Sequence, residues 1–207
     1  MRTLRGLYRG LEALYGADSG VDPVDFLVPF TAADSADAAE ELVVVREDDD
    51  GVEIGLALAT RVLERLEAQG HAHVLGDAAL ADTLPVLEGL SHLCYLVEAA
   101  RRERPVSGLE LETQAEVDKL ALCLLGRWPV PADDFGRLVD RIFCQWRLLP
   151  GLCAPLRERY QTANRVALNF VRRLERPVRA GQLGGLRRVL RRFWGADMAG
   201  KLELAGA

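Results

Sequence analysis

The chain has 207 residues and a formal net charge of -5, with 49% hydrophobic and 28% charged residues. This composition argues against a disordered chain, and the length fits one domain, residues 1–207, built around a single core. The four cysteines form no C-x-x-C pair and no apolar run is long enough for a signal peptide or a membrane span, so we expect a cytoplasmic protein without a disulfide scaffold.

Residues 1–75 are predicted to combine helices with a β-hairpin. The segments ELVVVRE (41–47) and VEIGLALA (52–59) flank Asp-Asp-Asp-Gly, and two β-branched or apolar runs around an Asp-Gly turn are typical of an antiparallel hairpin. The flanking segments are assigned by periodicity and turn content: a helix over 2–15, mostly loop over 16–40, a helix over 60–70 and a short third strand over 71–76.

Residues 80–195 are predicted to form the core of a helical bundle. The clearest boundary follows Pro105, where Ser107 and Glu110 have the spacing of a capping box and Val106 and Leu111 that of a hydrophobic staple. Apolar residues at steps of three and four predict helices over 83–103, 108–126, 134–147, 152–176 and 183–195, followed by a loose tail. The expected fold class is therefore mainly α, a bundle of about five to seven helices with a small N-terminal antiparallel β-hairpin.

Charge is distributed unevenly along the chain. Residues 17–53 contain twelve carboxylates and one arginine, whereas residues 157–192 contain eleven arginines, two glutamates and no lysine. Arginine is suited to bidentate recognition of carboxylates and phosphates, so the second segment favours contact with an acidic partner. The predicted partner-binding residues are Arg172, Arg173, Arg187, Arg188, Arg191 and Arg192.

Three interpretations of this arginine-rich end are open. It is a surface that binds an acidic protein or a nucleic acid, a solvated face whose charges pair with the acidic first quarter of the chain, or a membrane-surface helix anchored by Phe193 and Trp194. The first predicts a non-catalytic binding or regulatory protein, and the features are compatible with a homo-oligomer. The sequence contains no nucleophile elbow and no phosphate loop, requires no cofactor, and favours a binding role over an enzyme.

The alternative function is a metal-binding or enzymatic bundle with a polar site between helices 83–103 and 108–126. The residues that would build it are Glu88, His92, Tyr95, Glu112 and Glu116. Glutamate and histidine are common ligands of divalent transition metals, and positions three or four apart share a helix face. No metal is predicted firmly, because Glu88 and His92 are four residues apart whereas carboxylate-bridged bundles use a spacing of three.

Overall fold

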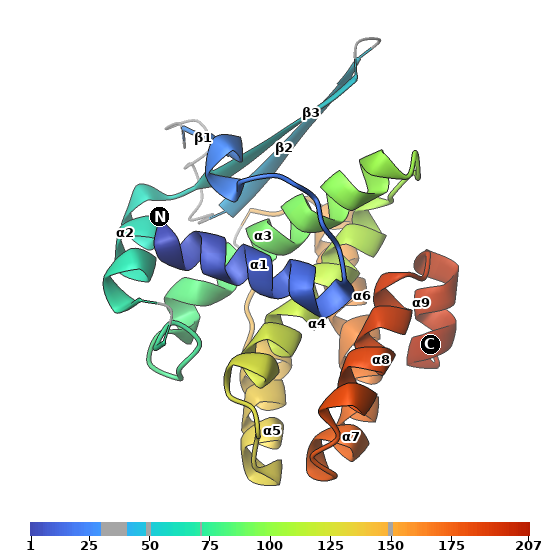
Figure 1. Ribbon diagram of the computed structural model, residues 1–207. Coiled ribbons are helices and arrows are strands. Elements are labelled where there is room, and N and C mark those ends of the chain that lie inside the picture. The colour runs from blue at the N-terminus through green and yellow to red at the C-terminus, as the bar shows by residue number, and fades with distance from the viewer. Residues whose placement is uncertain (30–40, 49–50, 71, 149–150) are drawn as a thin grey trace. The chain divides into compact units, whose positions relative to one another are not determined.

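The computed structural model describes residues 1–29, 41–48, 51–70, 72–148 and 151–207, and Figure 1 shows their helices and strands. Over these residues the chain is mainly helical, as predicted. Its contacts divide it into two compact units. Unit 1 comprises Met1–Pro105 with Leu149–Gly151, and unit 2 comprises Val106–Leu148 with Leu152–Ala207. The single domain with subregions 1–75 and 80–195 stays a prediction.

Unit 1 is built around one long helix, α3, which contacts α1, α2, β2 and β3. Because α3 has apolar residues on all sides rather than along one stripe, it is suited to a central position. The elements of unit 1 in the described ranges are α1 (Arg2–Tyr15), η1 (Pro23–Phe26), β1 (Leu27–Val28), β2 (Glu41–Asp48), β3 (Gly51–Leu58), α2 (Thr60–Gln69) and α3 (Leu80–Arg101).

The sheet of unit 1 has the strand order β1-β3-β2 and is mixed. Strand β2 runs antiparallel to β3, from Glu41 opposite Leu58 to Asp48 opposite Gly51, and β1 pairs with β3 in parallel. The sheet is thus not the antiparallel hairpin alone that the sequence predicted, because the segment assigned to loop supplies a strand. The Asp22 carboxylate accepts a hydrogen bond from the Val24 N–H at 3.0 Å and starts η1, which leads the chain directly into β1.

Two other expectations for unit 1 are corrected or lie outside the described residues. Residues 72–75 form turns rather than the predicted third strand, and residues 49–50 and 71 are not described. Helix α3 begins at Leu80, earlier than predicted, so Pro85 lies inside it rather than in its first turn. The Thr83 hydroxyl donates to the carbonyl of Val74 at 2.8 Å, which ties the preceding turns to the start of α3.

Helix α1 is capped by a residue from α2. The Glu67 carboxylate accepts hydrogen bonds from the backbone N–H groups of Arg2, Thr3 and Leu4 at 2.8, 3.1 and 3.0 Å. These are three of the N–H groups that a helix leaves without an internal partner. Burial raises the pKa of Glu67, but the three backbone hydrogen bonds outweigh it, so the pKa is lower than usual. The carboxylate therefore fastens α1 to α2 in its ionised form.

We expect Glu67→Ala to lower the free energy of unfolding by about 1 kcal/mol, as loss of a capping group does. A carboxyl whose pKa is depressed by folding stabilises above its unfolded pKa, and that stability is lost as the pH falls through the folded pKa. The Glu67 contribution should thus be complete near neutral pH and disappear below the usual glutamate pKa. Urea unfolding at a series of pH values measures it. Glu67→Gln, which keeps an acceptor oxygen, should show a weaker pH dependence than the unsubstituted chain.

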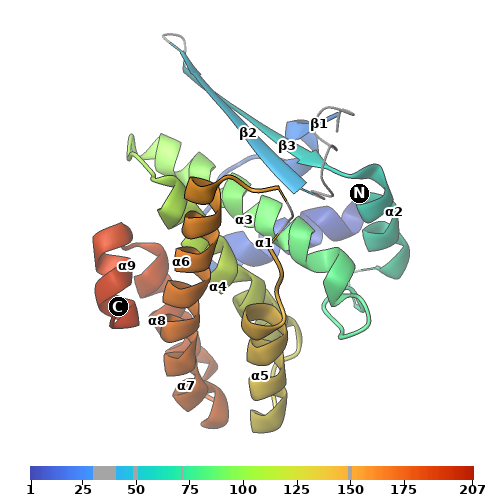
Figure 2. The same cartoon turned by 180° about the vertical axis from the view of Figure 1, so that it is seen from behind.

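The regular elements of unit 2 are all helices in its described residues, and Figure 2 shows them from behind. Helix α4 contacts α5, α6 and α9, while α8 contacts α7 and α9. Ser107 is the N-cap of α4 and accepts from the Glu110 N–H at 3.1 Å, which confirms the predicted start of this helix. The elements are α4 (Gly108–Gly126), α5 (Ala132–Val139), the π-helical turn η2 (Asp140–Cys144), α6 (Ala154–Val171), η3 (Arg172–Leu174), α7 (Glu175–Arg179), α8 (Leu183–Trp194) and α9 (Met198–Ala205).

The helix predicted over 152–176 is shorter than expected. Helix α6 ends at Val171, and the chain continues through the 3-10 turn η3 into α7. Pro177 accounts for this change, because its ring has no N–H and collides with the carbonyl four residues earlier in a regular helix. The result is that Arg172 and Arg173 lie in a tight turn between two helices.

The C-terminal segment, predicted to be loose, is the helix α9. The Asp197 carboxylate accepts from the Gly200 N–H at 2.8 Å, and Gly206 ends the helix with a φ of 68°. Both are usual helix-end signals, the second because a left-handed φ suits glycine. In the residues that the structure describes, no helix has the length and apolar character required to cross a membrane.

Candidate functional site

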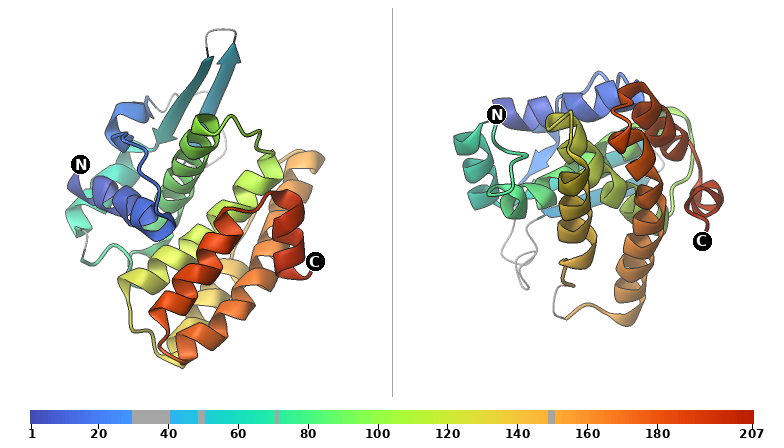
Figure 3. Two further views of the ribbon diagram at one scale, coloured as in Figure 1. Left: turned by 45° about the vertical axis from the view of Figure 1, so that its right-hand side comes forward. Right: turned by 90° about the horizontal axis from the view of Figure 1, so that it is seen from below.

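The six arginines predicted to bind a partner are all exposed and lie on η3 and α8 of unit 2. The segment 172–194 that carries them is drawn in orange-red in Figure 3. We call this set the arginine surface. On α8 the other three arginines follow Arg187 by one, four and five residues, so all four occupy one side of the helix. They are Arg172, Arg173, Arg187, Arg188, Arg191 and Arg192.

Most arginines of this surface form no ion pair with a described carboxylate. Across the described ranges, no ion pair involves Arg172, Arg173, Arg187, Arg188 or Arg192. Nearby on α7, Glu175 pairs with Arg179 at 2.7 Å, and both line a shallow, open depression with Arg176 and Ala180. The acidic first quarter belongs to unit 1, which is described separately, so the interpretation that it neutralises these arginines stays a prediction.

The opposite side of α8 is buried. Leu186, Leu190 and Phe193 are fully buried, and Trp194 is 6% exposed. Interfacial helices expose aromatic side chains to the lipid, whereas here both aromatic residues of α8 belong to the core. This arrangement disfavours the membrane-surface interpretation.

The arginine spacing on α8 carries an energetic cost. Like charges four residues apart on a helix destabilise it by about 0.2–0.5 kcal/mol per pair, and two such pairs are present, Arg187 with Arg191 and Arg188 with Arg192. Folding alone would favour alternating charges at these positions.

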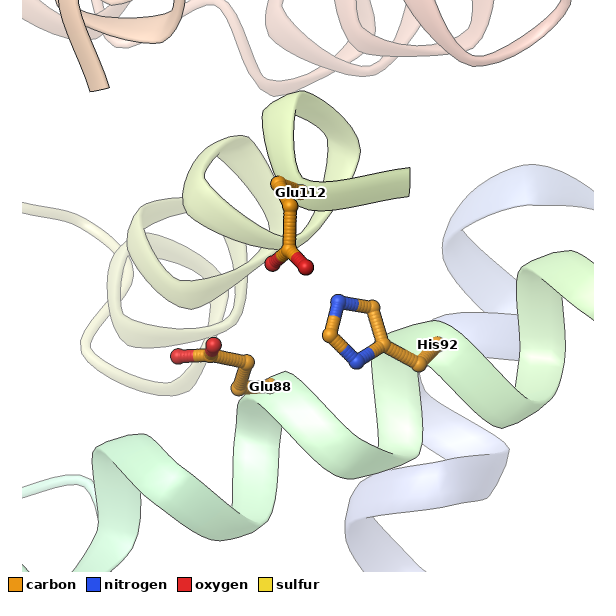
Figure 4. Close-up of side chains that lie close together, drawn as sticks. All are labelled: Glu88, His92 and Glu112. Carbon is orange, nitrogen blue, oxygen red and sulfur yellow. The ribbon is translucent and has the colours of Figure 1, made fainter. Parts of the chain in front are cut away.

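The polar residues predicted on α3 lie on successive turns of that helix. Figure 4 shows the side chains of Glu88 and His92 on one side of α3, with His92 buried and Glu88 half-buried. Tyr95 is also buried, and the guanidinium of Arg104 lies 5.2 Å from its ring centroid. A carboxylate beside an imidazole is a donor set suited to a divalent metal, as the sequence predicted.

The other two predicted ligands, Glu112 and Glu116, belong to α4 of unit 2. Glu116 pairs with the ammonium of Lys119 at 2.8 Å, so a cation already holds one of these carboxylates. Units 1 and 2 are described separately, and the joining of the α3 and α4 residues into one metal site stays a prediction.

A buried polar cluster in unit 2 was missed by the sequence analysis. Lys201 of α9 is 0% exposed, and its ammonium donates to the side-chain oxygen of Gln114 at 2.7 Å and to the carbonyl of Phe193 at 2.6 Å. The Gln114 amide in turn donates to the Asp118 carboxylate at 2.8 Å, and Asp118 is also buried. Lysine, aspartate and glutamine are seldom fully buried, and charged groups in unusual buried surroundings are common at functional sites.

Two signals in the sequence could have revealed this cluster. Lys119 and Lys201 are the only lysines among 26 basic residues, and polar residues occur on every side of the otherwise apolar segment 113–124. The first suggests positions where a flexible point charge is needed rather than a planar guanidinium.

Comparison with protein-family models, with curated proteins and with solved structures finds no match to this chain. Its function is therefore inferred from its own residues and their geometry.

Proposed function

We propose that the protein is a non-catalytic binding or regulatory protein whose arginine surface contacts an acidic partner, either a protein or a nucleic acid. The observation that carries this proposal is the exposure of six arginines on η3 and α8 with five of them in no ion pair across the described ranges. Guanidinium groups bind carboxylates and phosphates with two parallel hydrogen bonds.

The energetic cost of the surface supports a binding role. The like-charge pairs on α8 destabilise the helix, and residues that cost stability without serving the core are typical of functional surfaces. The formal charge of the whole chain is -5, so attraction to an acidic partner would be local to this surface.

The chemistry of the surface further defines the contact. Met1 and Val28 are the exposed large hydrophobic residues among those described, so the arginine surface offers no aromatic platform for unpaired bases. A partner would therefore be held through its acidic groups, which are carboxylates in a protein or backbone phosphates in a nucleic acid.

The test measures binding of two labelled polyanions, poly-L-glutamate and a short DNA duplex, by fluorescence anisotropy at several salt concentrations. A variant with Arg187→Gln, Arg188→Gln, Arg191→Gln and Arg192→Gln should bind the preferred polyanion about ten to a hundred times more weakly. The dependence of binding on salt should also become less steep, because fewer counterions are released.

The matched control carries the same change of charge elsewhere on the exposed surface. It combines Arg9→Gln, Arg102→Gln, Arg137→Gln and Arg147→Gln, and it should retain most of the affinity. Equal losses in both variants would show a general charge effect and contradict the proposal. Preference for one polyanion distinguishes a protein partner from a nucleic acid.

A further inference from the structure

The ammonium of Lys201 occupies a site formed by α4 and α8. It donates to the side-chain oxygen of Gln114 and to the backbone carbonyl of Phe193, and it lies 4.4 Å from the centroid of the Phe193 ring. The ring is held in place by stacking on Phe170 with centroids 3.9 Å apart. Carbonyl oxygens and an aromatic face together are the surroundings that stabilise a desolvated cation.

The orientation of the Gln114 side-chain amide is fixed by the hydrogen bond of its nitrogen. Its amide nitrogen donates to Asp118, so its oxygen is the atom that faces Lys201. Asp118 and Gln114 both belong to α4, and Phe193 belongs to α8. The groups that bind the ammonium therefore come from α4 and α8, and α9 contributes the lysine alone.

Helix α9 is short, and it contacts α4, α6 and α8. It spans eight residues, Met198–Ala205, of which Lys201 and Ala205 are buried. A helix of this length is unstable in isolation, and a terminal segment can detach by breaking its contacts at one end of the chain. Lys201 is the buried charged group that attaches α9.

Two contacts connect α9 with the arginine surface. Phe193, which accepts from Lys201, follows Arg192 in the last turn of α8. At the other end of α9, a Cβ atom added to Gly206 would lie 2.6 Å from the Nη2 atom of Arg173, so the guanidinium of Arg173 lies against the C-terminal cap of α9. A cation is favoured there by the helix dipole.

We propose that α9 is a detachable latch, held by Lys201, that regulates the arginine surface. Docked α9 fixes the end of α8 and engages Arg173. An acidic partner that takes Arg173 away from the cap of α9 favours release of the helix, and release in turn frees Arg173 for the partner. This reciprocal coupling rests on the proposed function, whereas the detachment of α9 does not.

The two lysines make the test direct. Reductive methylation of the folded chain modifies accessible amino groups, and mass spectrometry of peptides gives separate rates for the N-terminus, Lys119 and Lys201. If α9 detaches locally, Lys201 should be methylated at a rate almost independent of urea at low concentrations, because local opening exposes little surface. If the rate of Lys201 methylation instead rose with urea as steeply as global unfolding does, the latch proposal would be wrong.

A variant tests whether the ammonium site holds the helix. Gln114→Ala should raise the rate of Lys201 methylation about tenfold while the urea dependence of that rate stays shallow. Gln161→Ala, on an exposed position of α6, is the control and should leave the rate unchanged. An unchanged rate in Gln114→Ala would contradict the role of Lys201 as anchor.

A second arm tests the coupling separately. Saturating poly-L-glutamate should speed Lys201 methylation several-fold in the unsubstituted chain but not in Arg173→Gln. Binding of the polyanion without any change at Lys201 would overturn the coupling. Failure of both polyanions to bind would reject the proposed function, and the latch would still be decided by the methylation of the free protein.

Discussion

Replacement of Phe193 by alanine is expected to lower the free energy of unfolding of unit 2 by about 3–5 kcal/mol, the cost of removing a fully buried aromatic side chain. The substitution would also remove the aromatic ring that stacks on Phe170 and that faces the Lys201 ammonium. The loss should appear as a lower urea midpoint with an unchanged slope. A loss below about 1 kcal/mol would show that the site collapses without penalty, contrary to a close-packed core.

A matched pair of leucine variants isolates the aromatic contribution. Phe135 of α5 is also buried, and among the described residues it takes part in no ring contact. Leucine keeps much of the apolar volume at either position, so Phe193→Leu should cost about 1–2 kcal/mol more than Phe135→Leu, through loss of the stacking and cation–π contacts. Equal costs would show that the ring of Phe193 acts through its volume alone.

The helices of unit 2 could be predicted where a side chain interacts with backbone groups close to it in the sequence. Ser107 caps α4 because its hydroxyl oxygen reaches the Glu110 N–H, a local interaction that depends only on spacing. The amphipathic pattern of α8 likewise predicted which side is buried, since leucine and arginine recur with the helical period. The exposure of the arginine surface follows from the same pattern.

The parts that were missed depend on partners distant in the sequence. Strand β1 has two residues, too few for any periodicity, and it exists because β3 offers an edge for pairing. Lys201 and Gln114 are 87 residues apart, and although the rarity of lysine marks Lys201, the short segment around it does not show which distant residues would bury it. Local signals for α9 were present at Asp197 and Gly206 but could not show that the helix docks.

These misses and the proposed latch have one physical origin. A short terminal segment that is held by long-range contacts carries a weak pattern in the sequence and a low cost of detachment. By contrast, α8 has a continuous buried stripe that both predicts it and fixes it. The proposed latch α9 is thus held by long-range contacts, whereas α8, which carries most of the arginine surface, is held by its own buried side.

Replacement of Lys201 by methionine tests the energy of the buried contact, and the two effects of the change have opposite signs. Methionine removes the cost of burying a charge, but it deprives Gln114 and the Phe193 carbonyl of a donor, at about 1–3 kcal/mol for each acceptor. Removing one partner of a buried charged contact usually destabilises, so we expect a net loss of about 2–4 kcal/mol in the free energy of unfolding. Urea unfolding measures this loss.

A double-mutant cycle with Gln114→Met separates the contact from general damage to the core. Lys201 and Gln114 touch directly, so their effects should be non-additive by about 1–2 kcal/mol, whereas Lys201→Met and the exposed Gln161→Met should add. If α9 is a latch, the loss in Lys201→Met also cannot exceed the free energy that docks α9, which the methylation rates of the unsubstituted chain provide. An additive cycle, or a loss well above that docking free energy, would mean that Lys201 stabilises the whole of unit 2 rather than the attachment of one helix.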